Sequence, residues 1–200
     1  MNREAWLLAL IERLRPKFES LGAKLPDKIH VSVGFPSTRA LSEKKQRIGE
    51  CWPQASGADG SHQIFISPFL AEPLRVADVL LHELVHAALP DGTGHKKPFA
   101  QLAKRAGLEG KPTATTAGDE LKKELQTLIS ELGDYPHPGL RNGARAKKKQ
   151  TTRLLKAKCE KCGYTVRVSG KWLEVGPPIC PTDNVPLVAE ESDEEEEEDS

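Results

Sequence analysis

The chain has 200 residues with 29 basic and 29 acidic side chains, so its formal net charge is zero. This length predicts one main domain plus a smaller appendage, with enough residues for a hydrophobic core. No segment reaches the roughly 18 consecutive apolar residues that a membrane-spanning helix requires, so we expect no membrane span.

The first third of the chain predicts a helix and three short strands. Residues 3–21 have apolar side chains at helical spacing, and the apolar run 6–11 within them is short, so we read an amphipathic helix and not a secretory signal. We expect His30 and His62 to be structural or exposed and Cys51 to be a small buried residue. The strand-like segments are residues 28–35, 47–52 and 63–67.

The segment 73–89 combines a helical apolar pattern with the motif HELVH at residues 82–86. On a helix, residues four apart share a face, so His82 and His86 can bind one ion while Glu83 reaches a water bound to that ion. An incidental surface motif is the alternative, but a solvated face would not need the apolar residues that fill this segment. The pattern therefore predicts a catalytic zinc site.

A catalytic zinc site needs a third protein ligand and an open position for water. His95 is the best candidate, because a proline should end the helix and the turn 91–94 can carry the chain back towards the ion. Asp91 is the alternative ligand, and a turn residue is its simpler interpretation. The metzincin pattern is excluded, because its Gly and its third His would stand where this chain has Leu89 and Gly92.

Residues 82–108, HELVHAALPDGTGHKKPFAQLAKRAGL, resemble the SprT-like metallopeptidases. In that family HExxH is followed by a variable loop, a Gly-His pair and a Phe within the next helix. The resemblance extends upstream through the strand-like segments and downstream into a cysteine-bearing module, to about residue 188. The matching positions are His82, Glu83, His86, Gly94, His95 and Phe99.

Zinc chemistry predicts peptide-bond hydrolysis, in which the ion acidifies its bound water and Glu83 acts as general base. The resemblance implies a zincin-like fold and substrates that are associated with DNA or crosslinked to it, as for Spartan-type members. The style of the cysteine module is similar to that of phage and bacterial members. Two alternatives stay open: a non-catalytic, DNA-binding or transcription-associated accessory protein with a structural zinc, and a general cytosolic peptidase.

Two more helices are predicted after His95, at residues 97–107 and 119–132, the second with leucines at the spacing of a core-packing face. The stretch 135–139 should close the catalytic domain. We expect His137 within it to be a turn residue and not a ligand.

Between Arg141 and Lys158 eight basic residues occur without an acidic one. Such a run suits binding to DNA phosphates, single-stranded or nonspecific, although a solvated linker is an equal alternative for the run alone. The aromatic ring of Trp172 can stack on exposed bases or pack the small core of the module. The predicted nucleic-acid contacts are Arg145, Lys147, Lys148, Lys149, Arg153, Lys156, Lys158 and Trp172.

The C-terminal module has the spacing of a zinc ribbon, with Cys159 and Cys162 in one knuckle and Cys180 in the next. The second knuckle reads Cys-Pro-Thr-Asp, so the fourth ligand of a structural zinc is Asp183 or is missing, and loss of the site is the alternative. A redox role of the first CxxC is less favoured, because no βαβ pattern surrounds it. Thiolates that bind metal indicate a reducing compartment, which predicts the cytoplasm, or the host cytoplasm for a phage protein.

Residues 190–200 hold nine acidic residues and no basic one, which leaves 29 basic against 20 acidic residues, or +9, in the rest of the chain. This tail reads as a disordered solubilising extension or as an intramolecular competitor of nucleic acid. In total we predict an α+β monomer. Its parts are a zincin-like catalytic domain at residues 1–140, a basic linker at 141–152, a zinc ribbon at 153–189 and the acidic tail at 190–200.

Overall fold

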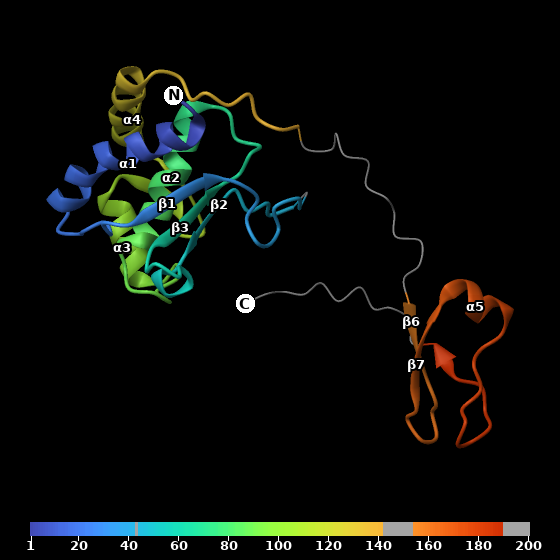
Figure 1. Ribbon diagram of the computed structural model, residues 1–200. Coiled ribbons are helices and arrows are strands. Elements are labelled where there is room, and N and C mark those ends of the chain that lie inside the picture. Colours follow the sequence, from blue (N-terminus) through green and yellow to red (C-terminus); the bar gives the residue numbers. More distant parts are fainter. Residues whose placement is uncertain (43, 142–153, 190–200) are drawn as a thin grey trace. The chain divides into compact units, whose positions relative to one another are not determined.

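The structure is a computed structural model that describes residues 1–42, 44–141 and 154–189 (Figure 1). The chain divides into two compact units, residues 1–144 and 145–200. Helices and small sheets both occur, which confirms the expected α+β class. Within the described ranges, no helix is long and apolar enough to cross a membrane.

A three-stranded sheet forms one layer of the first unit (Figure 1). β1 (Ile29–Val33) pairs in parallel with β3 (His62–Ile66), and β2 (Gly49–Trp52) pairs antiparallel with β3 at the edge, after which η1 (Gln54–Ser56) leads into β3. Alternate side chains of β1 and β3 are buried, so one face of the sheet packs on the core. The buried ones are Ile29, Val31, His62, Ile64 and Ile66.

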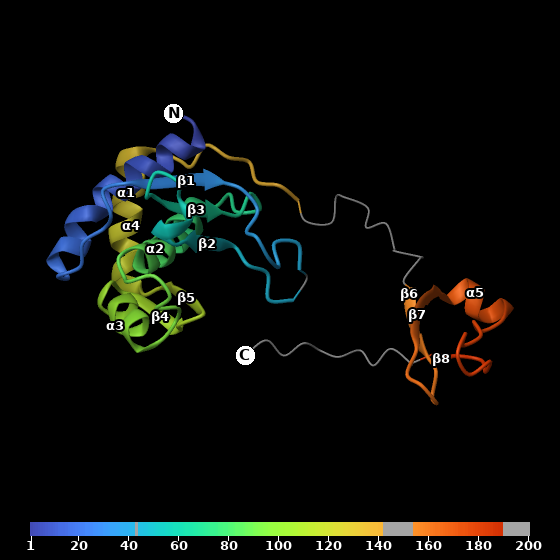
Figure 2. The ribbon, with the colours of Figure 1, turned by 60° about the horizontal axis from the view of Figure 1, so that its bottom comes forward.

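Helices cover this buried face (Figures 1 and 2). α1 (Arg3–Ser20) contacts β1, α2 (Pro73–Ala87) contacts β2 and β3, and α4 (Asp119–Leu132) packs on both α1 and α2. α3 (Lys97–Arg105) packs against α2 and carries the buried Phe99. The largest fully buried side chains of this core are Trp6, Phe18, Phe99, Leu7, Leu10, Ile11 and Leu14.

The sequence placed these four helices well but missed a hairpin between α3 and α4. In the hairpin, β4 (Leu108–Lys111) pairs antiparallel with β5 (Ala114–Ala117). Its strands have four residues each, and most of their side chains are small or polar, which gives neither a helical nor a clear strand pattern. Gly107 turns the chain from α3 into β4 at φ 95°, a conformation that favours glycine. The predicted ends of α1 to α4 differ from the observed ones by two residues at most.

The second unit is a small sheet with one short helix. β6 (Leu154–Lys158) pairs antiparallel with both β7 (Thr165–Ser169) and β8 (Val188–Ala189). α5 (Gly170–Val175) follows β7 directly and was not predicted. The buried residues of this unit are few: Ala157, Cys159, Cys180 and Leu187. A core of this size provides little stability without a bound metal.

Candidate metal centre

The helix α2 positions the first two histidines of the predicted site. Its N-terminus is capped by Glu72, whose carboxylate accepts hydrogen bonds from the backbone N–H groups of Leu74 (2.8 Å) and Arg75 (2.6 Å), and Pro73 occupies the first turn. The four-residue spacing then places the rings of His82 and His86 on one face, with centroids 5.2 Å apart. The rest of the helix is largely buried in the core, which fixes its orientation.

A turn after α2 brings His95 back to the same face. Leu89 N–H bonds the carbonyl of His86, and Gly92 and Gly94 adopt φ values of 78° and 55°, which residues other than glycine rarely reach. As a result, His95 Nε2 lies 3.2 Å from His82 Nε2 and 3.1 Å from His86 Nε2. One nitrogen atom of each of the three imidazoles therefore faces a common centre.

These distances fit a zinc ion. Zn–N bonds of about 2.05 Å at tetrahedral angles would place two ligand nitrogens roughly 3.3 Å apart. The observed separations of 3.1 and 3.2 Å are close to this value, and ligand atoms of all three residues lie within 4.8 Å of one another. The group of possible ligands contains His95 and not Asp91, which is exposed in the turn.

The ring of Phe99 packs against the rings of all three histidines. It is fully buried, and its centroid lies 4.9 Å from His82, 4.3 Å from His86 and 4.9 Å from His95. Phe99 belongs to the first turn of α3, so the packing of α3 on α2 also sets the position of His95, two residues before that helix. The site thus depends on two helices and the turn that joins them.

Burial keeps the imidazoles neutral, which is the form that binds metals. It lowers the pKa of His82 to about 3, to which the neighbouring His86 and His95 contribute, and the pKa of His86 to about 4. Burial also lowers the pKa of His95. The lowered pKa values favour the neutral imidazoles over the protonated ones at neutral pH.

Glu83, on the same turn of α2, faces the edge strand β2. It is buried, and a Cβ added to Gly49 would lie 2.3 Å from its Oε1 atom, so the carboxyl group is packed against the backbone of β2. Burial raises the pKa of Glu83 to about 8, which the charge of Arg47 opposes and that of Glu50 reinforces. Gly49 and Arg47 both shape the surroundings of Glu83. Neither was identified from the sequence, because nothing in HExxH specifies which strand packs on the helix.

Thr115 on β5 is a third residue that the sequence reading missed. Its Oγ1 atom lies 2.7 Å from Nδ1 of His82, the ring nitrogen that points away from the other histidines. Thr115 lies 33 positions after His82 in the chain, and it belongs to a hairpin that was not predicted. No local sequence signal could have indicated this contact.

The remaining three histidines lie outside this cluster and have other hydrogen-bond partners. His30 Nε2 lies 3.2 Å from Asp59, His62 Nδ1 lies 3.3 Å from the carbonyl oxygen of Trp52, and His137 Nε2 lies 2.9 Å from the carbonyl oxygen of Pro68. They are structural or surface residues, as expected. Cys51 is partly buried, and burial together with the charge of Glu83 raises its pKa to about 12.

The second group of possible metal ligands lies in the ribbon unit. Cys162 Sγ is 3.5 Å from Cys180 Sγ, and Asp183 Oδ2 is 3.3 Å from Cys159 Sγ and 3.6 Å from Cys180 Sγ. Tetrahedral zinc would separate such ligand atoms by roughly 3.6 to 3.8 Å. All four cysteines of the chain are free, so none of these thiols is lost to a disulfide. The four residues fit one ion.

The two knuckles of the ribbon have the same backbone hydrogen bonds. Cys159 accepts from Gly163 N–H (2.9 Å) and donates to Tyr164 (2.8 Å), while Cys180 accepts from Asn184 N–H (2.9 Å) and donates to Val185 (2.8 Å). Gly163 and Asn184 both have positive φ, 79° and 53°. Asp183, directly before Asn184, therefore holds the position that Cys162 holds in the first knuckle, which is why its carboxylate meets the thiols.

Most predicted nucleic-acid contacts lie outside the described residues: Arg145, Lys147, Lys148, Lys149 and Arg153. Lys156 and Lys158 lie on β6, and Trp172 lies on α5. Trp172 is 58% exposed and Lys171 Nζ lies 5.4 Å from its ring centroid, so the ring is not part of the ribbon core. The acidic residues 190–200 are also outside the described part.

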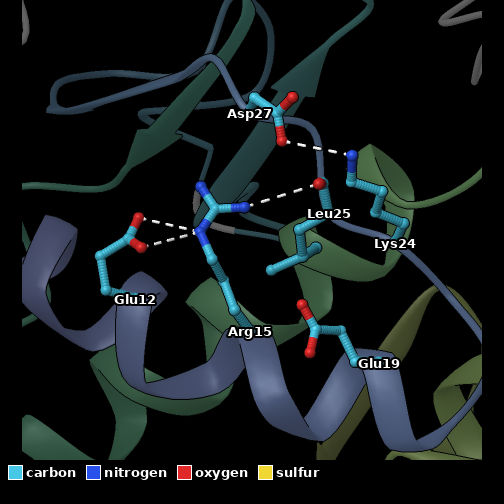
Figure 3. Close-up of a pocket in the computed structure, with 6 residues that line it drawn as sticks. All are labelled: Glu12, Arg15, Glu19, Lys24, Leu25 and Asp27. Carbon is cyan, nitrogen blue, oxygen red and sulfur yellow. Dashed lines mark hydrogen bonds and ion pairs between the residues drawn. The ribbon is translucent and has the colours of Figure 1, made fainter.

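A surface hollow of about 300 Å³ lies between α1 and the segment that follows it (Figure 3). Arg15 donates to the carboxylate of Glu12 at 2.9 Å and to the carbonyl oxygen of Pro26 at 3.0 Å, and Lys24 pairs with Asp27 at 3.5 Å. The Arg15 and Lys24 side chains are thus engaged by neighbouring groups, and the bond from Arg15 to Pro26 links the chain after α1 to that helix. None of the predicted site residues lines it.

No protein-family model matches this chain, and no curated protein or solved structure matches it either.

Proposed function

We propose that the protein is a zinc-dependent peptidase of the SprT-like type with a zincin-like catalytic unit. The observation that carries this proposal is the convergence of the Nε2 atoms, 3.1 and 3.2 Å from His95 to its two partners, beside a glutamate of the same helix turn as two of them. His82, Glu83 and His86 have the spacing at which a helix presents two ligands and a base to one ion.

Each residue of the cluster has a defined part in hydrolysis. Zinc, if bound by His82, His86 and His95, would supply a Lewis acid for the activation of water and for the polarisation of the scissile carbonyl. Glu83 acts in its ionised form, which the positive charge of a bound ion favours against the burial that raises its pKa; it accepts a proton from the attacking water and transfers it to the leaving amine. Packing of Glu83 against Gly49 holds its carboxyl group in one place and excludes competing solvent.

A second zinc, held by Cys159, Cys162, Cys180 and Asp183, stabilises the ribbon in this proposal. The closeness of the four ligand atoms and the matching hydrogen bonds of the two knuckles support it. Because the ribbon buries so few apolar residues, the binding free energy of this ion is a large part of its folding free energy. Reduced thiols of this kind belong in the cytoplasm.

For the substrate we propose proteins that are associated with DNA or crosslinked to it. Support comes from the uninterrupted basic run of residues 141–158 and from the exposed ring of Trp172 on the ribbon. Lysines and arginines in such a run bind phosphates, and an exposed indole can stack on an unpaired base. DNA would then concentrate the peptidase on proteins bound to the same strand.

The substitution Glu83→Gln tests the function. It keeps the size of the side chain but removes the proton acceptor, so we expect zinc to remain bound and cleavage to fall by roughly 10²- to 10⁴-fold. The measurement is cleavage of a DNA-binding protein with and without single-stranded DNA, together with the zinc content of each preparation. Glu120→Gln, at an exposed position of α4, is the matched control and should retain full activity.

Three results would separate the proposal from its alternatives. Wild-type protein that binds zinc but cleaves nothing with DNA present would favour a non-catalytic, DNA-binding accessory protein. Cleavage that is equally fast without DNA would favour a general peptidase. Undiminished cleavage by the Glu83→Gln variant would remove Glu83 as the base.

A further inference from the structure

Thr115 contacts one of the candidate metal ligands without being a ligand itself. Its Oγ1 atom lies 2.7 Å from Nδ1 of His82, while Nε2 of the same ring faces His95 at 3.2 Å. We propose that Thr115 is a positioning residue, which fixes the orientation and tautomer of His82 and thereby raises the affinity of the histidine site for zinc. This inference rests on the proposed function, because it assumes that zinc binds the three histidines.

The tautomer follows from the chemistry of the imidazole ring. A neutral imidazole carries one proton, and a metal can bind only the nitrogen that lacks it. Because Nε2 of His82 faces the other ligands, its proton must be on Nδ1, and Nδ1–H then donates to the hydroxyl oxygen of Thr115. In the other tautomer the hydroxyl would donate to Nδ1, and Nε2–H would point into the site. The hydrogen bond to Thr115 therefore has one direction whenever a metal is bound.

The hairpin holds Thr115 in place for this contact. Thr115 and Ala117 are the two buried residues of β5, and the backbone N–H of Ala117 faces the carboxyl group of Asp78, whose pKa is raised by burial. Two strand residues span about 6.7 Å and four helix residues about 6.0 Å, so Thr115 opposite His82 and Ala117 opposite Asp78 are in register. The strand β5 thus runs alongside α2 and carries the hydroxyl to the ring.

Burial strengthens the hydrogen bond between Thr115 and His82. Thr115 is only 8% exposed, so water is largely excluded from the position that its hydroxyl occupies. Among the residues that the structure describes, Thr115 is the one side chain within hydrogen-bonding distance of an Nδ1 atom in this histidine cluster. Outer partners of this kind typically change metal affinity by about 10- to 100-fold when they are removed.

The test is zinc affinity of the full-length protein, measured by competition with a chromophoric chelator. Thr115→Val keeps the shape of the side chain and removes the hydroxyl, so we expect zinc to bind the histidine site about 10- to 100-fold more weakly. Thr115→Ser keeps the hydroxyl and should bind zinc nearly as tightly as the wild type. Thr116→Val makes the same chemical change on the exposed face of β5 and is the matched control.

Cobalt(II) separates the two metal sites within one sample. Sulfur-to-cobalt charge transfer reports only the thiolates of the ribbon, so this absorption should be unchanged in every variant and serves as an internal reference. Thr115→Ala compared with Thr115→Ser repeats the removal of the hydroxyl in a smaller side chain, which keeps the comparison valid if valine disturbs folding. The melting temperature of each metal-free variant shows whether the fold is intact.

Three outcomes would overturn an assumption of this inference. If Thr115→Val binds zinc as tightly as the wild type, the hydroxyl does not position His82. If Thr115→Ser is as weak as Thr115→Val, the methyl group and not the hydroxyl is responsible. If the wild type itself binds no metal at the histidines while the ribbon is loaded, the proposed peptidase site is wrong, which is a different failure from the first two.

Discussion

Gly49 shows how a single residue far from the motif sets the geometry of Glu83. The backbone of β2 lies so close to α2 that a Cβ at this position would be 2.3 Å from Glu83 Oε1 and 2.7 Å from Val79 Cγ1. Real side-chain atoms do not approach so closely, so either the strand or the carboxyl group would have to move. Glycine here is a packing requirement of the site.

We therefore expect Gly49→Ala to reduce cleavage by roughly 10²-fold, the cost that a displacement of about 1 Å brings to a catalytic group. Zinc content should stay at the wild-type level, because the atoms nearest to a Cβ at Gly49 belong to Glu83 and Val79 and not to the three histidines. Gly34→Ala is the control: its Cβ would meet only the ring of Phe65, at 3.3 Å. Full activity of the Gly49→Ala variant would show that Glu83 is not held by this contact.

At the scale of elements, the two knuckles of the ribbon are equivalent except in their second ligand. Gly163 and Asn184 have the same left-handed conformation after Cys162 and Asp183, and the flanking backbone hydrogen bonds match. Asparagine is among the few residues besides glycine that adopt this conformation readily. The backbone of the second knuckle thus retains the form of a zinc knuckle although a carboxylate replaces a thiolate.

If Asp183 is the fourth ligand, Asp183→Ala should weaken zinc binding by the ribbon by at least about tenfold, since even substitutions outside a ligand set change affinity by that much. Asp183→Cys should strengthen it, because zinc in structural sites prefers thiolate. Cobalt charge-transfer titration of the ribbon measures both, with Thr182→Ala in the same turn as control. Equal affinity of Asp183→Ala and wild type would show that the site uses three cysteines only.

At the scale of the whole molecule, charge is divided along the chain. The nine acidic residues of 190–200 cancel an excess of nine basic residues in the rest, many of them in residues 141–158. Charges of opposite sign on one chain attract each other, and salt weakens that attraction. If the basic run binds DNA as proposed, we expect the tail to compete with DNA phosphates for it.

Deletion of residues 190–200 should then lower the dissociation constant for single-stranded DNA on the order of tenfold at low salt, and much less at high salt. Fluorescence anisotropy over a salt series measures both effects. A tail of the same length with Gln and Asn at its nine acidic positions is the matched control and should behave like the deletion. Unchanged affinity in both variants would remove the tail as a competitor.

The sequence determined the local parts of this protein: α2, the placement of the candidate ligands His82 and His86 on one helix face, the turn to His95 and the first knuckle. These depend on the helix period, on glycines and prolines at turns and on the chemistry of His and Cys, all of which can be read within about twenty residues. For the same reason the limits of the four larger helices were predicted closely.

Only the tertiary structure decided which distant residues complete the site. Gly49 packs on Glu83 because β2 packs on α2, and Thr115 reaches His82 because an unpredicted hairpin runs alongside α2. Asp183 meets the cysteines because two knuckles face each other across the ribbon. Such contacts join residues far apart in the chain and follow from the packing of the core, which sequence periodicity does not specify.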